Sequence, residues 1–92
     1  MFNERLRLVR ESRNMNQIQL AQLLGVSKQS VSNWENDNIQ PSIEMLIKIA
    51  RLFSISTDYL LGLDSRRYIE ISGLTNTQIA HIQQIVHDII SN

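Results

Sequence analysis

The sequence contains no cysteine, one proline and three glycines among its 92 residues. Without cysteine, neither a disulfide framework nor a thiolate metal site can form, which suits a reducing compartment such as the cytoplasm. No apolar run approaches the roughly 18 residues that a membrane-spanning helix needs. The N-terminus also lacks the basic start and apolar stretch of a signal peptide. We therefore expect a cytoplasmic protein with one small domain and a single hydrophobic core.

An excess of charge of either sign is also missing, because nine basic residues balance nine acidic ones. A zero net charge argues against a protein that binds nucleic acid by charge alone, without regard to sequence. Residues 1–68 hold all nine basic and seven of the acidic residues, so this part carries +2 and the remainder −2. Four arginines lie within residues 1–13. A solvated helix face is the ordinary explanation of such a cluster, and phosphate contact is the alternative.

Capping signals divide residues 1–63 into short helices, and the alternation typical of strands is almost absent. The predicted N-caps are Asn3, Asn16, Ser27 and Ser56, and Gly25 is predicted to end the second helix. Pro41 and Ser42 are predicted to open the fourth helix. The predicted inner faces are Leu6, Val9 and Arg13 in the first helix, Leu20, Ala21, Leu23 and Leu24 in the second, Val31 and Trp34 in the third, and Met45, Leu46, Ile49, Ala50 and Phe53 in the fourth. The pattern predicts an all-α domain of five short helices.

Only Gly25 and Val26 separate the second and third helices, which is the spacing of a helix-turn-helix. Three stretches, residues 15–27, 31–36 and 41–61, closely resemble the phage-repressor and Cro family of helix-turn-helix domains, also called the XRE type. This resemblance implies a repressor-like, DNA-binding domain at residues 1–63. It also implies that the third helix is the recognition helix and lies in the major groove of double-stranded DNA.

Side-chain chemistry agrees with that assignment. The third helix turns four polar residues away from Val31 and Trp34: Lys28, Gln29, Ser32 and Asn33. Gln and Asn can bond adenine through N6 and N7, and Lys can donate to guanine. An ordinary polar surface is the alternative explanation of such a face. In the context of a helix-turn-helix, we predict that these four residues read bases.

Phosphate contacts are expected where helices begin, because free backbone N–H groups gather there. The predicted phosphate-contacting residues are Arg10, Gln17, Ser27, Ser30, Asn36, Asn38, Gln40 and Ser42. By resemblance, Gln17 bonds a phosphate and braces the first side chains of the recognition helix. For Asn38, simple turn chemistry is an equally good explanation.

The resemblance also implies a salt bridge between Arg10 and Glu35 beside the DNA backbone, in which Glu35 orients Arg10 toward phosphate. As a surface pair it would add only about 0–1 kcal/mol to stability. Trp34 is expected in the core, with stacking on nucleic acid as the minor alternative.

Two residues depart from the family pattern. Asp37 stands where many members have glycine, and its negative charge is unfavourable beside phosphate, although Asp tolerates a left-handed backbone. Ile18 occupies a position that usually carries a polar residue, so it either contacts a partner or lies exposed.

The tail adds a second element. Residues 64–73 are expected to form a linker, with possible extended structure at 68–73. Thr75 and Gln78 have the spacing of a capping box, and Leu74 with Ile79 matches a hydrophobic staple, so a helix is predicted within residues 74–92. Its apolar stripe consists of Ile79, Ile82, Ile85, Val86, Ile89 and Ile90.

A lone helix of about sixteen residues is marginal in water, so this stripe must be buried. It can pack on the same helix of a second chain, on its own domain, or on a different protein. We expect dimerisation, because a two-fold protein needs a way to set the spacing of its half-sites.

Together these features predict a dimeric transcriptional repressor that reads a pseudo-palindromic operator. One alternative is an antitoxin-like regulator whose tail binds a partner protein, and another is an interaction adaptor that has lost DNA binding. His81 and His87 are six residues apart, which is not the spacing of a helical metal pair. We expect no enzymatic activity, no metal and no cofactor.

Overall fold

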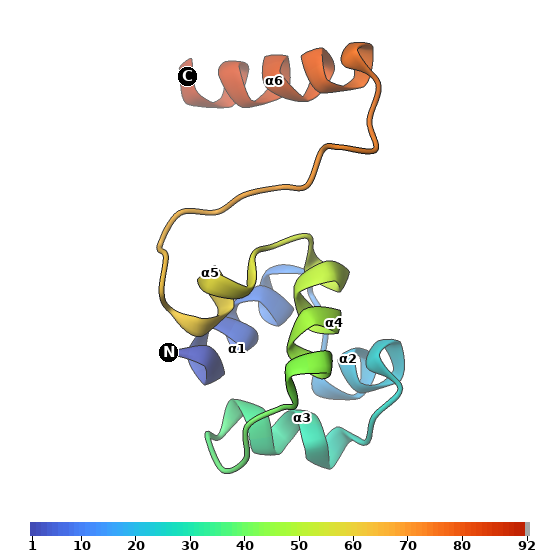
Figure 1. The fold of residues 1–92 in the computed structure, drawn as a ribbon, viewed down its shortest axis with the longest axis vertical. Helices are drawn as coiled ribbons and strands as arrows, with labels where there is room; N and C mark the ends of the chain where they lie inside the picture. The colour runs from blue at the N-terminus through green and yellow to red at the C-terminus, as the bar shows by residue number, and fades with distance from the viewer. Residues whose placement is uncertain (92) are drawn as a thin grey trace.

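The computed structural model describes residues 1–91, which form six helices and no strand (Figure 1). The helices are α1 (Phe2–Ser12), α2 (Gln17–Leu24), α3 (Lys28–Glu35), α4 (Ile43–Phe53), α5 (Thr57–Leu61) and α6 (Asn76–Ser91). The predicted all-α class, with five short helices followed by an amphipathic C-terminal helix, is confirmed. No helix among these residues combines the length and apolar character needed to cross a membrane.

Three of the four predicted N-caps are confirmed. The side chains of Asn16, Ser27 and Ser56 each accept a hydrogen bond from the backbone N–H three residues later. Ser42, predicted together with Pro41 to open the fourth helix, caps α4 in the same way, so α4 begins at Ile43. The prediction for Asn3 is wrong, because α1 already begins at Phe2 and Asn3 lies inside it. Phe2 is buried in the core, and this packing extends the helix almost to the N-terminus.

The helices α1 to α5 surround one hydrophobic core. Its buried residues are Phe2, Leu6, Val9, Leu20, Ala21, Leu24, Val31, Trp34, Ile49, Ala50, Phe53, Tyr59 and Leu60. The predicted inner faces are wrong at two residues. Leu23 is 52% exposed because it lies beyond the edge of the arc formed by Leu20, Ala21 and Leu24, and Arg13 is an exposed residue just after the end of α1.

The turn between α2 and α3 is tight. Gly25 ends α2 in the left-handed conformation, with a φ of 72°, which costs glycine nothing. The N–H of Val26 donates to the carbonyl of Ala21, and the Lys48 ammonium donates to the carbonyl of Leu24 at 2.8 Å. These bonds fix the end of α2 and so the direction in which α3 leaves the turn.

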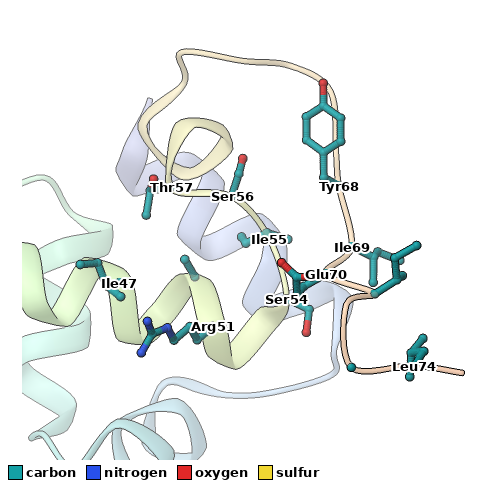
Figure 2. Close-up of a pocket in the computed structure, with 13 residues that line it drawn as sticks. Ile47, Arg51, Ser54, Ile55, Ser56, Thr57, Tyr68, Ile69, Glu70 and Leu74 are labelled. Carbon is teal, nitrogen blue, oxygen red and sulfur yellow. The ribbon is translucent and has the colours of Figure 1, made fainter.

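The segment between α5 and α6 runs along the side of the domain opposite α3 (Figure 1). Its start is held by Arg5, whose Nη1 donates to the carbonyls of Tyr59 and Asp64. Further on, it lines a groove of about 760 Å³ with the turn between α4 and α5; Ile47 and Arg51 come from α4, and Ile69 and Leu74 from the linker (Figure 2).

The helix α6 begins with the predicted capping box. The Thr75 N–H donates to Oε1 of Gln78, and the Gln78 N–H donates to Oγ1 of Thr75. None of the residues of α6 is buried. The last residue of the predicted segment 74–92, Asn92, lies outside the described residues. The stripe of aliphatic side chains on α6 therefore remains available to a partner.

Candidate nucleic-acid interface

The helix α3 has one buried side and one open side. Val31 and Trp34 are in the core, which confirms the prediction for Trp34. Lys28 and Gln29 are exposed, and Ser32 and Asn33 are half-buried. Because Ser27 caps the helix through the Ser30 N–H, these four polar residues occupy the first turns, which is where groove-reading helices contact bases.

Two of these residues are joined by a hydrogen bond between their side chains. Nε2 of Gln29 donates to Oδ1 of Asn33 at 3.0 Å, across one helical turn. The bond uses one N–H of Gln29 and the carbonyl oxygen of Asn33. The Asn33 side chain keeps its two N–H donors, and Gln29 keeps an acceptor and one donor. The pair can therefore meet base edges as one preformed unit.

A buried carboxylate, Glu35, lies at the other end of α3. Nε of Arg10 donates to its Oε2 at 2.7 Å, and Nη2 of Arg10 donates to its Oε1 at 2.9 Å. Nε2 of Gln17 and Nε of Arg7 also reach Oε1, at 3.2 and 3.4 Å. Glu35 thus joins α1, the start of α2 and the recognition helix. We call Arg7, Arg10, Gln17 and Glu35 the Glu35 cluster.

The predicted pair of Arg10 and Glu35 is confirmed, but the expectation of a surface pair is wrong. Arg10 is 8% exposed and Glu35 only 2%, because α1, α2 and α3 close over them. Nη1 of Arg10 also donates to the carbonyl of Met15 at 2.7 Å. All three nitrogens of this guanidinium are engaged within the protein, so the geometry does not favour the predicted direct contact of Arg10 with phosphate.

The pair is ionised despite its burial. Desolvation raises the pKa of Glu35, but hydrogen bonds from Arg10, Gln17 and Arg7 outweigh it and hold that pKa below its ordinary value. The hydrogen bond to Glu35 raises the pKa of Arg10. A buried and fully hydrogen-bonded ion pair is costly to break, because removal of one partner leaves the other charge without compensation.

Gln17 lies in the first turn of α2, where backbone N–H groups have no partner within the helix. Its amide donates to Glu35 at the end of α3, whereas the resemblance implied a brace to the first side chains of that helix. The half-buried amide still has a second N–H for a phosphate.

Residues 36–42 form a polar loop after the Glu35 cluster. Asp37 has a φ of 59°, which explains why glycine is common here in the family. Nε2 of Gln40 donates to Asp37, and Nδ2 of Asn36 donates to Oγ of Ser32. The predicted phosphate-contacting residues of the loop, Asn36, Asn38, Gln40 and Ser42, are all exposed.

Two further predicted residues are placed as follows. The hydroxyl of Ser30 lies 3.0 Å from that of Ser27 at the start of α3. Ile18, on the exposed side of α2, is 52% exposed.

Sequence reasoning did not single out Arg7 as part of the site. The signal was its place three residues before Arg10, which puts both arginines on one face of α1.

A family model for the helix-turn-helix matches residues 6–60, more than half of the chain. The chain belongs to the helix-turn-helix family. The helices α2 and α3 of this helix-turn-helix protein are the pair for which the family is named. The resemblance to phage-repressor and Cro-like domains is confirmed by this match together with the similarity to the C2 repressor of Salmonella phage P22, which is 33% identical over 61 residues.

The following known proteins are among those similar to this helix-turn-helix protein. The transcriptional regulator ImmR of Bacillus subtilis is 32% identical over 87 residues, which cover 95% of this chain and 68% of ImmR. The P22 c2 repressor in complex with a synthetic operator superposes with a TM-score of 0.65 at 33% identity, over 70% of this chain and 97% of the repressor chain. A transcriptional regulator from Listeria innocua superposes with a TM-score of 0.66 at 25% identity, over 99% and 94% of the two chains.

The chain spans about half the length of several curated relatives that it matches. The similarity to those relatives therefore concerns the helix-turn-helix domain.

Proposed function

We propose that this protein is a sequence-specific, double-stranded DNA-binding transcriptional regulator of the cytoplasm that acts as a dimeric repressor. One observation carries the proposal: α3 is capped, anchored by Val31 and Trp34, and opens a polar face near its N-terminal end. The likeness to a repressor bound to its operator supports it. In this proposal residues 1–63 bind DNA, and the C-terminal helix pairs two chains. Residues 64–73 form the linker between these two parts.

The open face of α3 provides the base contacts. Gln29 and Asn33, joined by their hydrogen bond, suit adenine and its neighbouring base, because the pair offers both donors and an acceptor. Lys28 suits guanine, and Ser32 adds a contact with little preference. Specificity is thus assigned to residues on one rigid helix.

The phosphate contacts lie around that face. They are assigned to Gln17, to the serines at the start of α3, and to the loop that follows α3. The full set is Gln17, Ser27, Ser30, Asn36, Asn38, Gln40 and Ser42. Arg10 has an indirect role, since it holds Glu35 and thereby α3 against α1. These contacts set register and contribute affinity without reading sequence.

Pairing of two chains is assigned to α6. Its stripe of Ile79, Ile82, Ile85, Val86, Ile89 and Ile90 has no buried member within the chain, and β-branched residues at such a seam favour helix pairing. Sixteen residues make a helix about 24 Å long, enough for a short pair of helices.

The test is selection of bound sequences from a random pool of double-stranded DNA with the full chain. We expect a pseudo-palindrome whose half-sites lie about 34–36 Å apart, or a multiple of that, on one face of the DNA. Absence of any enriched sequence, together with absence of salt-dependent binding, would show that the chain is not a DNA-binding regulator.

A second candidate is favoured by the same exposed stripe. An antitoxin-like regulator would bind a different protein through α6 and still bind DNA through α3. Purification of the full chain from its native cells would then yield a second protein in fixed ratio, and a version ending at Gly73 would lose it. An adaptor without DNA binding predicts no binding in the selection experiment. No catalytic role is proposed for any residue.

A further inference from the structure

We propose that Arg7 supplies the guanidinium that α1 offers to the DNA backbone, while Arg10 serves only to position α3. The inference rests on the proposed function, because it names a further residue of the same DNA-binding face. It follows from a division of labour between two arginines on one helix that share one carboxylate.

Arg10 has few donors left for a ligand. Its side chain is 10% exposed, and its Nε, Nη1 and Nη2 all donate to Glu35 or to the carbonyl of Met15 over 2.7 to 2.9 Å. To bond a phosphate, it would have to give up part of the contact that holds Glu35, a side chain with no exposed surface.

Arg7 is held much more loosely. Its side chain is 48% exposed, and its two hydrogen bonds are both 3.4 Å long, one from Nε to Oε1 of Glu35 and one from Nη2 to the Glu35 carbonyl. Bonds of that length lie at the weak end of the usual range. A phosphate can therefore draw the guanidinium outward without exposing the buried pair.

The position of Arg7 is that of a phosphate contact. Its Nε and Nε2 of Gln17 meet the same oxygen of Glu35, and its Nη2 meets the carbonyl that precedes Asn36. The guanidinium thus lies between two residues that are assigned to phosphates, at the start of α2 and at the start of the loop.

The charge of the cluster points the same way. Two guanidiniums share the single carboxylate of Glu35, and Arg10 already makes the close, two-point contact with it. Glu11 also approaches Arg10, at 3.7 Å, but it is 60% exposed and well solvated. The positive charge of Arg7 therefore remains at the surface of the cluster without a close partner. When α3 binds DNA, a backbone phosphate is the group that lies beside this edge of the domain.

The experiment compares the salt dependence of binding to a mixed-sequence duplex long enough to hold two half-sites, for the full chain and for Arg7→Gln. Each lost phosphate contact makes the negative slope of log K against log salt shallower by about 0.9, so for a dimer the slope should become shallower by about 1.8. Arg7→Lys should keep the slope near that of the wild type, since it keeps the charge. Arg66→Gln is the matched control, because Arg66 is also exposed and lies in the linker, outside the residues to which DNA binding is assigned.

Each outcome decides a separate point. An Arg7→Gln slope equal to that of the wild type and of Arg66→Gln would overturn the role of Arg7 and leave the proposed function standing. A wild-type chain that binds the duplex without salt dependence would overturn both. Trp34 fluorescence on unfolding in urea checks that the variants fold. A shallower slope in folded Arg7→Gln, with the wild-type slope recovered in Arg7→Lys, supports the inference.

Discussion

Arg10 donates to both carboxylate oxygens of Glu35 beneath the surface where α1, α2 and α3 meet, at 2.7 and 2.9 Å. The two residues are 25 positions apart in sequence, so this contact fixes the recognition helix to the first helix of the domain. The pair therefore belongs to the fold that presents α3, and we propose that it affects DNA binding only through α3.

Loss of Arg10 should destabilise the domain strongly. Arg10→Ala leaves a buried carboxylate without its partner, and such changes cost about 3–5 kcal/mol. Unfolding in urea, followed by the fluorescence of Trp34, measures the change. Arg13→Ala is the control, because Arg13 is exposed and makes one hydrogen bond to the carbonyl of Phe53, which is worth about 1 kcal/mol. Equal effects of the two variants would contradict a structural role for the buried pair.

The pKa of Glu35 predicts how stability depends on pH. Because the pKa in the folded protein lies below the ordinary value of 4.5, the unfolded chain binds more protons in this range. The stabilisation is then complete above about pH 4.5 and is lost as the pH falls through the folded pKa. Urea unfolding at a series of pH values should show this loss in the wild type.

Glu35→Gln isolates the contribution of this carboxylate. The variant should be less stable at pH 7 and should lose less stability on acidification than the wild type. Glu44→Gln removes an exposed carboxylate in the first turn of α4, and it should retain the loss that Glu35 causes. Parallel pH profiles for the wild type and Glu35→Gln would show that Glu35 does not contribute in this way.

The contrast between helix caps and the Glu35 cluster shows what sequence predicts well. The caps Asn16, Ser27 and Ser56 are local, since each side chain bonds a backbone N–H three residues away, and they were predicted correctly. Burial of Glu35 is not local, because three helices must converge before the carboxylate loses contact with water.

The same reason explains what was missed. Spacing along α1 places Arg7 and Arg10 on one face, but it does not tell which of them the neighbouring helices cover. The surface that covers α6 could not be predicted for a different reason. No residue of α6 is fully buried within the described residues, so its amphipathic pattern indicates only that some surface must cover it.

Base reading should be separable from phosphate contact by mutation. Gln29→Ala or Asn33→Ala should cost about 1–3 kcal/mol on the selected site and little on mixed-sequence DNA, whereas Gln17→Ala should weaken both. Titration of labelled duplexes at one fixed salt concentration gives these affinities. Gln22→Ala, which removes an exposed amide from α2, is the control.

Because Gln29 and Asn33 are hydrogen-bonded, the double variant should lose less affinity than the sum of the two single losses. Small, uniform losses at all three sites would contradict base reading by α3.

Asp37 is predicted to weaken DNA binding by its charge. Asp37→Asn keeps a side chain that tolerates the φ of 59° and can accept the bond from Gln40, so stability should be unchanged. Removal of a negative charge about 10 Å from a phosphate is worth on the order of 0.4 kcal/mol in water. Each subunit should therefore contribute a small gain in affinity for mixed-sequence DNA, and this gain should vanish at high salt. A gain that persists at high salt would point to a cause other than charge.

Removal of α6 should convert the protein to a monomer while its DNA-binding domain stays folded. A chain that ends at Gly73 keeps all the core residues, so its unfolding in urea should remain cooperative, and sedimentation should give the mass of one chain where the full chain gives two. Ile82→Asp should act like the truncation, because it places a charge within the apolar stripe. Ala80→Asp is the matched control, since Ala80 lies on the opposite side of α6 at helical spacing.

Dimerisation also has a readout on DNA. On a duplex with two half-sites, the truncated chain should bind each half independently and with lower affinity than the full chain, because the second contact is no longer intramolecular. If the full chain and the truncated chain each sediment as a monomer, pairing through α6 is contradicted. The exposed isoleucines would then have to be covered by a different protein, which is the condition under which the antitoxin-like candidate becomes the better explanation.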